Sequence, residues 1–440
     1  MQIDLIFTSK NISYTSKIIY RDQTLPSRIC VISSFPPVKG GEATYAQDFV
    51  LAMEHFLQNE IREIHVLSHA EGNKLKGSEK RGRIQVTRLY DSLSFFGRNC
   101  AFAKILLKIM SIRPDVVHLQ YSTIPDGRYG GLLGESLFIL FFILKILRIP
   151  LYVTQHSVWL LDQAHERIYE KTGNKTLTRL GMWYFKAFTH FFGIMPQKLF
   201  LLVNIRNSEL TKRFSQEYNI PMEKIREEVH GVWVNNDVGM TKDTKDGKIV
   251  CLGVINPSKG YEFTIQAMSS VLEEYPQASL VIAGSPPPTN YYEGKKYIRR
   301  LMEMINELKL QHSITIEDKY LSDEEFAGHI RTANLVVLPY SKVVGASGIM
   351  HLAMRYRVPI VVAGSGLLFD ELSEFVPVVP PMNPKALSNE IIRILSDRHY
   401  CTLLVDKYNR YLMDHNWQGV TKNIYEEYTR ATKTGRTIGD

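Results

Sequence analysis

Short apolar runs alternate with helical stretches along most of the chain. The first run, RICVISSF, starts at Arg28 and is followed by a Pro/Gly-rich turn and by EATYAQDFVLAMEHFL, whose apolar residues recur every three or four positions. REIHVLSH, RIQVTRLY, DVVHLQYS and PLYVTQHS come next, and each ends in polar or small residues. Such runs are typical of parallel strands that open onto a ligand crevice. The alternation therefore predicts an α/β fold with a doubly wound sheet.

A second series of the same kind follows a polar segment, TKDTKDGK, which we interpret as an interdomain linker. It contains KIVCLGVI, ASLVIAGS, SITIED, NLVVLPY and VPIVVAG, separated by helical stretches. We therefore expect two tandem Rossmann-like domains with a cleft between them, where a ligand binds by default. The expected divisions are an N-terminal extension (1–27), an N-terminal Rossmann-like domain (28–240), the linker (241–248), a C-terminal Rossmann-like domain (249–396) and a helical C-terminal tail (397–440).

Composition narrows the class of protein further. Of the 440 residues, 45% are hydrophobic and 22% are charged, which excludes a disordered or collagen-like chain. The net charge of +8 suits phosphates or a membrane surface. Because no basic run is present, we expect no nucleic-acid partner.

Cysteine spacing and hydropathy bear on the compartment. The four cysteines lie far apart without a C-x-x-C pair, so neither a disulfide framework nor a zinc site is expected. The longest apolar run, residues 137–144, is far shorter than the ~20 residues of a membrane span. The first residues lack the basic and apolar regions of a signal peptide. These features predict a cytoplasmic protein.

Three turns carry residues suited to anion binding. Lys39, Gly40 and Gly41 lie between the first strand and the first helix, where glycines let backbone N–H groups approach an anion. Lys259, followed by Gly260, opens a helix after KIVCLGVI. An ordinary βα turn and a solvated lysine are the alternatives at these two places.

The third turn precedes a helix in the second half of the chain. Ala346, Ser347 and Gly348 offer N–H donors and a hydroxyl to an anion, and similar small-residue turns recur at 283–285 and 364–366. Ser347 equally suits a helix N-cap, its commonest role at such a position.

Several of these segments together resemble a known family. FPPVKGGEATYAQDF, DVVHLQYS, PLYVTQHS, VHGVWV, LGVINPSKGYEFTIQAM, ASLVIAGSP, ANLVVLPY and SGIMHLAMRYRVPIVVAGSG occur in the order found in GT-B glycosyltransferases. The resemblance covers roughly residues 28–375 and is to the retaining, nucleotide-sugar-dependent family 4. It implies a hexosyltransferase that needs neither a metal nor a cofactor and takes a glycan or lipid-linked acceptor, as in polysaccharide biosynthesis. It also implies that residues 28–240 form the acceptor-side domain and residues 249–396 the nucleotide-sugar-binding domain.

The resemblance also implies roles for individual residues. Lys259 matches the family's diphosphate-binding lysine, and His156 matches a histidine near the transferred sugar; these two are the candidate catalytic residues. Asp370, with Glu371 beside it, matches an acidic residue that follows the family's glycine loop. The expected donor-binding residues are Gly40, Gly41, Lys259, Ser347, Gly348, Gly366 and Asp370.

Three positions depart from the family pattern. Val254 stands where an arginine is common, and Val344 and Leu352 stand where the paired glutamates E-x7-E fall. The chain therefore resembles a variant branch that lacks these glutamates. The departures leave two alternatives open, a catalytically degenerate GT-B-like binding subunit and a nucleotide-sugar epimerase.

An aromatic and basic segment is a second candidate surface. RLGMWYFKAFTHFFGIM contains Trp183 and Phe191 together with Arg179 and Lys186. It would suit a lipid-linked acceptor or a peripheral contact with the inner membrane face. The same spacing also suits the buried side of a helix.

Overall fold

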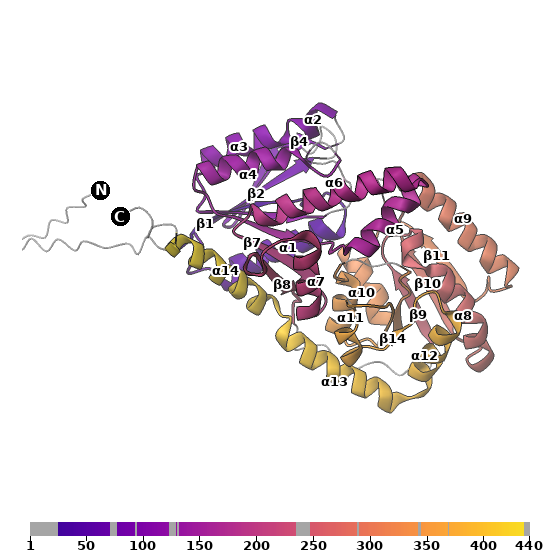
Figure 1. Cartoon of the computed structure of the whole chain (residues 1–440). Helices are drawn as coiled ribbons and strands as arrows, with labels where there is room; N and C mark the ends of the chain where they lie inside the picture. Colours follow the sequence, from indigo (N-terminus) through magenta and orange to yellow (C-terminus); the bar gives the residue numbers. More distant parts are fainter. Residues whose placement is uncertain are drawn as a thin grey trace, which may run out of the picture.

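The protein is described by a computed structural model in which two parallel sheets each carry helices on both faces (Figure 1). The structure describes residues 25–70, 77–92, 95–122, 129, 132–234, 247–287, 290–341, 345–367 and 369–434. Nearly all of the expected extension and most of the expected linker lie outside these residues.

The N-terminal sheet has eight strands in the order β3-β4-β2-β1-β5-β6-β7-β8. All neighbours are parallel except β3, which pairs antiparallel with β4 at the edge. The strands are β1 (Arg28–Ile32), β2 (Glu63–Ala70), β3 (Gly77–Arg81), β4 (Ile84–Asp91), β5 (Val116–Tyr121), β6 (Leu151–Gln155), β7 (Lys198–Val203) and β8 (Ile225–Val229). The chain runs from β1 to β2 on one side of β1, whereas β5 to β8 follow on its other side, so the direction of strand addition reverses at β1.

Helices cover both faces of this sheet. They are α1 (Gly41–Phe56), α2 (Phe95–Asn99), α3 (Ala101–Ile112), α4 (Ser136–Ile146), α5 (Leu161–Thr172), α6 (Lys175–Ile194) and α7 (Ser208–Tyr218). Right-handed crossovers place α3, α4 and α6 on the face opposite α1. The apolar run 137–144 lies in α4, where Leu137, Leu140 and Leu144 are buried. Among the described helices, none is both long enough and apolar enough to cross a membrane.

The C-terminal sheet has six parallel strands in the order β11-β10-β9-β12-β13-β14, which reverses at β9. Its strands are β9 (Lys248–Leu252), β10 (Ser279–Gly284), β11 (Ile314–Asp318), β12 (Leu335–Leu338), β13 (Ile360–Ala363) and β14 (Val378–Val379). Its helices are α8 (Tyr261–Glu274), α9 (Tyr291–Glu307), α10 (Asp323–Thr332), α11 (Gly348–Arg355) and α12 (Pro384–Ser396). Two doubly wound units in tandem confirm the predicted fold class.

The last two helices join the domains. From the C-terminal domain, α13 (Arg398–Asp414) and α14 (Trp417–Thr434) run back to the N-terminal domain, where α14 packs against α1 (Figure 1). The Tyr425 hydroxyl donates to the Pro26 carbonyl (3.0 Å), and Arg226 donates to Glu427 (2.7 Å). Trp417 is buried against Gly231, where any side chain would overlap its ring. The C-terminal tail therefore packs against both domains, α13 against the C-terminal one and α14 against the N-terminal one.

Candidate functional site

The carboxyl ends of the two sheets face each other across the domain boundary. The Ser347 amide, after β12, donates to Asn204 Oδ1 (2.8 Å), after β7. Asn207 Nδ2 donates to the Leu367 carbonyl (3.0 Å), which follows β13. Loops at the carboxyl edge of each sheet thus meet, and ligands of doubly wound sheets bind at this edge, where the strand order reverses. The two reversal points, after β1 and after β9, carry the predicted glycine turn and the predicted lysine.

Lys259 is held in a tightly fixed turn after β9. It ends the 3-10 helix η4 (Pro257–Lys259), which Asn256 caps by accepting from the Ser258 amide (3.0 Å). Gly260 has a left-handed φ of 66°, and a Cβ there would lie 2.1 Å from the Pro339 carbonyl oxygen. Only glycine fits so close to that backbone. The turn is therefore fixed against the loop that follows β12.

The ammonium of Lys259 lies over an aromatic ring. Its Nζ is 4.5 Å from the centroid of Tyr340, and the side chain is half-buried. No carboxylate of the described residues lies within 4.0 Å of this nitrogen. A cation placed at a reversal point without a partner carboxylate there is available to an anionic ligand.

Ser347 is the N-cap of α11. Its Oγ accepts from the Met350 amide (3.3 Å) and pairs with the Tyr340 hydroxyl (2.7 Å). The Ser347 amide donates to Asn204, so both the hydroxyl and the amide of Ser347 are hydrogen-bonded within the protein. Gly348, the first residue of α11, is exposed, and a Cβ added to it would lie 3.6 Å from His230 Nε2. The helix start therefore opens outward at Gly348 rather than at Ser347.

The glycine turn after β1 leaves open space at the start of α1. Gly40 has a φ of 145°, both Gly40 and Gly41 are exposed, and a Cβ at either position would meet no atom within 4 Å. Lys39, beside them, lies 4.1 Å from the ring centroid of Tyr320, which follows β11 in the other domain. The turn thus reaches across the domain boundary while the helix N-terminus stays uncovered.

His156 follows β6 and is half-buried at the boundary. Its Nε2 is 2.7 Å from Gln120 Oε1, and because that oxygen only accepts, Nε2 carries the proton. The ring packs edge-on against Tyr45 at 4.8 Å. A Cβ on Gly345 would lie 2.2 Å from the His156 carbonyl oxygen, so the loop before α11 passes directly over His156.

A group of buried rings at the boundary adds no positive charge. His230 stacks on His351 with ring centroids 4.5 Å apart, and burial lowers the pKa of His230 to about 4. Burial also holds the pKa of His351 well below its usual range. His351 contacts the Ser347 carbonyl (2.7 Å) and the Tyr411 hydroxyl (2.8 Å), so it does not reach into the cleft in place of the family glutamate. His230 and His351 are therefore uncharged at neutral pH, and Lys39 and Lys259 supply positive charge at the boundary.

The loop after β13 holds the remaining predicted residues. Gly366 has a φ of 80°, a Cβ added to it would meet no atom within 4 Å, and the Asp370 amide donates to its carbonyl (3.2 Å). Asp370 is exposed. Of the departures from the family pattern, Val254 is exposed, whereas Val344 lies outside the described residues.

Sequence reasoning missed Asn204 and His230, which directly follow the buried strands β7 and β8. A polar residue at the end of a buried strand was the available signal for each. Only the structure shows that Asn204 bonds a residue 143 positions away.

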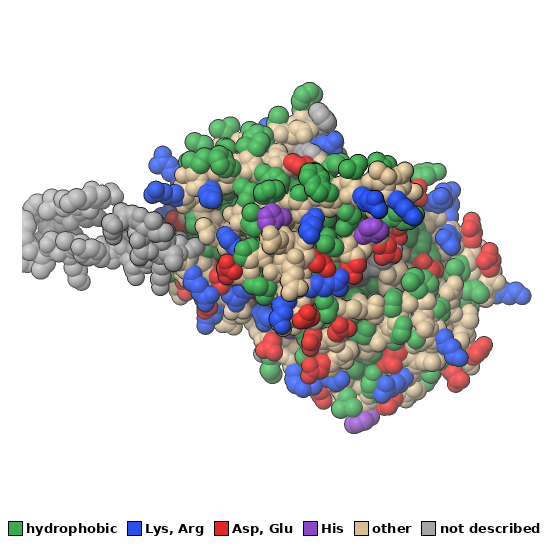
Figure 2. All heavy atoms as spheres, in the orientation of Figure 1, with side chains coloured by type: hydrophobic (Ala, Val, Ile, Leu, Met, Phe, Trp, Pro, Cys, Tyr) green, Lys and Arg blue, Asp and Glu red, His purple; other side chains and the backbone are tan. Residues whose placement is uncertain are grey.

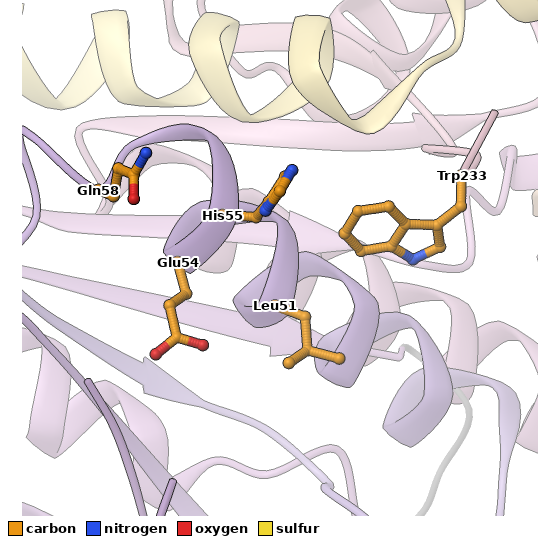
Figure 3. A pocket seen from close by; sticks show the side chains of 5 residues that line it. All are labelled: Leu51, Glu54, His55, Gln58 and Trp233. Atoms are coloured by element: carbon orange, nitrogen blue, oxygen red, sulfur yellow. The ribbon is translucent and has the colours of Figure 1, made fainter. Parts of the chain in front are cut away.

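A groove on α1 lies apart from these residues. Leu51, Glu54, His55 and Gln58 line it together with Trp233, which faces His55 in Figure 3. Trp233 donates to Asp48 (3.0 Å), which holds the indole against the helix. None of the predicted site residues lines this groove, so it is not part of the candidate site.

Comparisons with known proteins agree with this arrangement. Residues 235–411 match the family of glycosyl transferases group 1. This match and the two-domain fold confirm the resemblance to GT-B glycosyltransferases, while family 4 stays a prediction. No curated protein sequence matches.

Solved structures give the same fold at low identity. Anabaena HepE (Alr3699) in complex with UDP-glucose has a TM-score of 0.64 and 14% identity, over 92% of this chain and 99% of that one. Sucrose-phosphate synthase from Thermosynechococcus elongatus has a TM-score of 0.66 and 17% identity, over 93% of this chain and 100% of that one. The trehalose-6-phosphate synthase OtsA has a TM-score of 0.67 and 10% identity, over 92% of this chain and 99% of that one. At these identities the likeness establishes the fold alone.

Proposed function

We propose that this protein transfers a sugar from a nucleotide sugar to an acceptor hydroxyl, with retention of configuration at the transferred carbon. The observation that carries the proposal is Lys259, a cation held by Gly260 at the reversal point of the group 1 domain, with no described carboxylate beside it. HepE, which has the same fold, was crystallised with UDP and with UDP-glucose. We expect the donor diphosphate to bind at this lysine.

The proposed mechanism assigns the protein an electrostatic role. When the bond between the sugar and the diphosphate breaks, negative charge grows on the leaving oxygen, while the acceptor hydroxyl oxygen bonds to the sugar and passes its proton to the departing diphosphate. A preorganised cation stabilises that charge without reorganising, which is worth roughly 10²–10³ in kcat for a single contact of this kind. Lys259 supplies the cation in this scheme. The N-termini of α1 at Gly40–Gly41 and of α11 at Gly348 add partial positive charge.

The other predicted residues act on the sugar in this proposal. His156, whose Nε2 is held by Gln120, lies in the N-terminal domain beside the loop that precedes α11. Gly366 and Asp370 would approach the sugar from the loop after β13, and Ser347 fixes the start of α11. We propose neither a metal nor a cofactor in the reaction, and turnover in EDTA tests the metal part.

The acceptor in this proposal is a glycan or a lipid-linked saccharide at the cytoplasmic face of a membrane. All four cysteines are free thiols in the structure, and a cytoplasmic location is part of this proposal. We expect peripheral contact with the membrane, and a role in polysaccharide synthesis would follow from such an acceptor.

A second candidate is a binding subunit without turnover. Val254 stands at the place of the family's arginine and Leu352 at that of its second glutamate. This candidate predicts a folded protein that binds a nucleotide but releases none from any donor.

The deciding experiment measures nucleotide release from UDP-, GDP-, ADP- and dTDP-sugars with membrane lipid extract as the acceptor source. We expect release from one donor, a loss of roughly 100-fold or more in Lys259→Ala, and no change in Lys296→Ala, which alters an exposed residue of α9. Full activity in Lys259→Ala would refute the site. No release by a folded protein would favour the binding subunit, and release of free sugar without an acceptor product would favour a hydrolytic or epimerase activity.

A further inference from the structure

Three helices of the N-terminal domain form a continuous outer layer. α3 packs against α4, and α4 packs against α6 through the rings of Phe138 and Phe188, whose centroids are 5.0 Å apart. Figure 1 shows α3, α4 and α6 along the same side of the molecule, away from α1 and α14. We call the solvent side of these helices the α3–α4–α6 face.

This face exposes large apolar side chains. Trp183 is 72% exposed, Leu107 67% and Ile146 63%. Figure 2 shows hydrophobic side chains gathered with Lys and Arg over this part of the molecule. The exposed apolar residues of the face are Leu107, Met110, Ile139, Phe142, Ile146, Leu177, Leu180, Trp183 and Phe191.

These side chains cannot turn inward, because the opposite sides of the same helices already fill the core. Phe185, Phe188 and Phe192 of α6 are buried, and the ring centroids of Phe141 and Phe192 are 5.5 Å apart. One side of α6 is therefore buried, as the helix-core alternative predicts, whereas Trp183 and Phe191 on its other side are exposed. Exposed apolar patches of this kind mark interaction surfaces.

The charge on the face has one sign. Although the chain has 45 Asp and Glu residues, none lies within α3, α4 or α6. Exposed Lys104, Lys145, Arg179 and Lys186 lie among the apolar side chains. Acidic residues resume on the neighbouring α5, at Asp162, Glu166 and Glu170.

We infer that the α3–α4–α6 face docks on an anionic lipid bilayer. Its apolar side chains would enter the boundary between headgroups and acyl chains, and its lysines and arginine would contact lipid phosphates. A protein interface fits less well, because lysine is depleted in such interfaces whereas here it recurs on all three helices. The docking is inferred from exposure and charge alone. Its role, which is to bring the acceptor-side domain to a membrane-borne acceptor, rests on the proposed function.

The test is co-sedimentation of the full chain with vesicles of phosphatidylcholine alone and with vesicles of phosphatidylcholine mixed with phosphatidylglycerol. We expect binding to the anionic vesicles only, weakened by salt. Lys145→Glu with Arg179→Glu and Lys186→Glu should lower the partition coefficient by about 100-fold or more. Trp183→Ser should lower it by roughly tenfold.

A matched variant on α9 controls for net charge and for exposed apolar area. Tyr292→Ser with Lys296→Glu, Arg299→Glu and Arg300→Glu changes one exposed aromatic and three exposed basic residues of the other domain, and should bind vesicles as the unchanged protein does. Equal melting temperatures of all variants show that folding is intact. The inference is wrong if the unchanged protein ignores anionic vesicles, if both face variants bind normally, or if the α9 variant loses as much.

Sedimentation velocity without lipid tests whether a second copy of this chain, rather than a bilayer, covers the α3–α4–α6 face. If the unchanged protein is a dimer that Trp183→Ser converts to a monomer, the face is an interface between copies and the inference is overturned. Nucleotide release from the donor, measured on the same variants in detergent-free buffer, keeps this outcome distinct from the proposed function. If the unchanged protein releases nucleotide but does not bind anionic vesicles, only the docking face is refuted. If it binds the vesicles but releases no nucleotide from any donor, only the transferase is refuted.

Discussion

Replacing Gly260 by alanine should damage both the stability and the activity of this protein, because two separate costs arise at that position. An L-residue with φ near 66° costs roughly 1–2 kcal/mol relative to glycine. The added Cβ would also lie 2.1 Å from the Pro339 carbonyl oxygen, far inside an ordinary contact. Relieving that overlap requires a backbone shift, which adds about 1–3 kcal/mol.

Gly173 provides the matched control for this experiment. It has a φ of 58°, it ends α5, and a Cβ there would meet no atom within 4 Å. Gly173→Ala should therefore carry only the conformational cost of about 1–2 kcal/mol. The free energy of unfolding, measured with urea, should fall by about 2–5 kcal/mol in Gly260→Ala.

Activity should separate the two variants more clearly than stability does. The backbone shift at Gly260 displaces its neighbour Lys259, and a misplacement of about 1 Å at a catalytic group can cost roughly 100-fold in rate. Nucleotide release should fall to that extent in Gly260→Ala and stay unchanged in Gly173→Ala. If both variants lose the same stability and both keep full release, the close contact with Pro339 does not position the lysine.

Three further predictions follow from buried polar groups. Asn204→Ala leaves the Ser347 amide without its acceptor and should cost about 1–3 kcal/mol in urea unfolding, whereas an unchanged midpoint would contradict the cross-domain bond. Burial is the main cause that lowers the pKa of His118 to about 3, and the nearby His156 lowers it further. As pH falls below 6.5, His118 is therefore protonated in the unfolded chain but not in the folded protein. Stability should drop by about 2 kcal/mol from pH 7 to 5 on this account, and His118→Gln should remove that part of the slope. Burial raises the pKa of Asp48 to about 6, so its ionisation lowers the stability of the fold by about 2 kcal/mol as pH rises from 4 to 7. Asp48→Asn should therefore stabilise the protein more at pH 7 than at pH 4, and an equal effect at the two pH values would count against this explanation.

The strands of both sheets could be predicted from sequence because central parallel strands are buried on both faces. β5 and β7 show this directly, since every residue of β5 and all but Lys198 of β7 are buried. β3 could not be predicted, because its residues GSEKR are all exposed and carry no apolar pattern. Its position depends on pairing with β4 at the sheet edge.

The positions of site residues were predictable, but their partners were not. Lys259 could be placed at a helix start after a strand, because that depends on neighbouring residues alone. The bond from Ser347 to Asn204 joins residues 143 positions apart, and the contact of His118 with Tyr428 joins residues 310 positions apart. No local pattern encodes such contacts, because they arise only when the two domains and the C-terminal tail pack together.

The central claim is that Lys259 faces the donor diphosphate, and calorimetric titration tests it most directly. UDP, GDP, ADP and dTDP would be titrated into the unchanged protein and into Lys259→Ala, alongside the corresponding nucleosides without phosphates. We predict that the substitution weakens binding of the preferred diphosphate by about tenfold to 100-fold and leaves the nucleoside unchanged, since a hydrogen bond to a charged group is worth about 1.5–3 kcal/mol. Equal affinity of the two proteins for the diphosphate would contradict the claim.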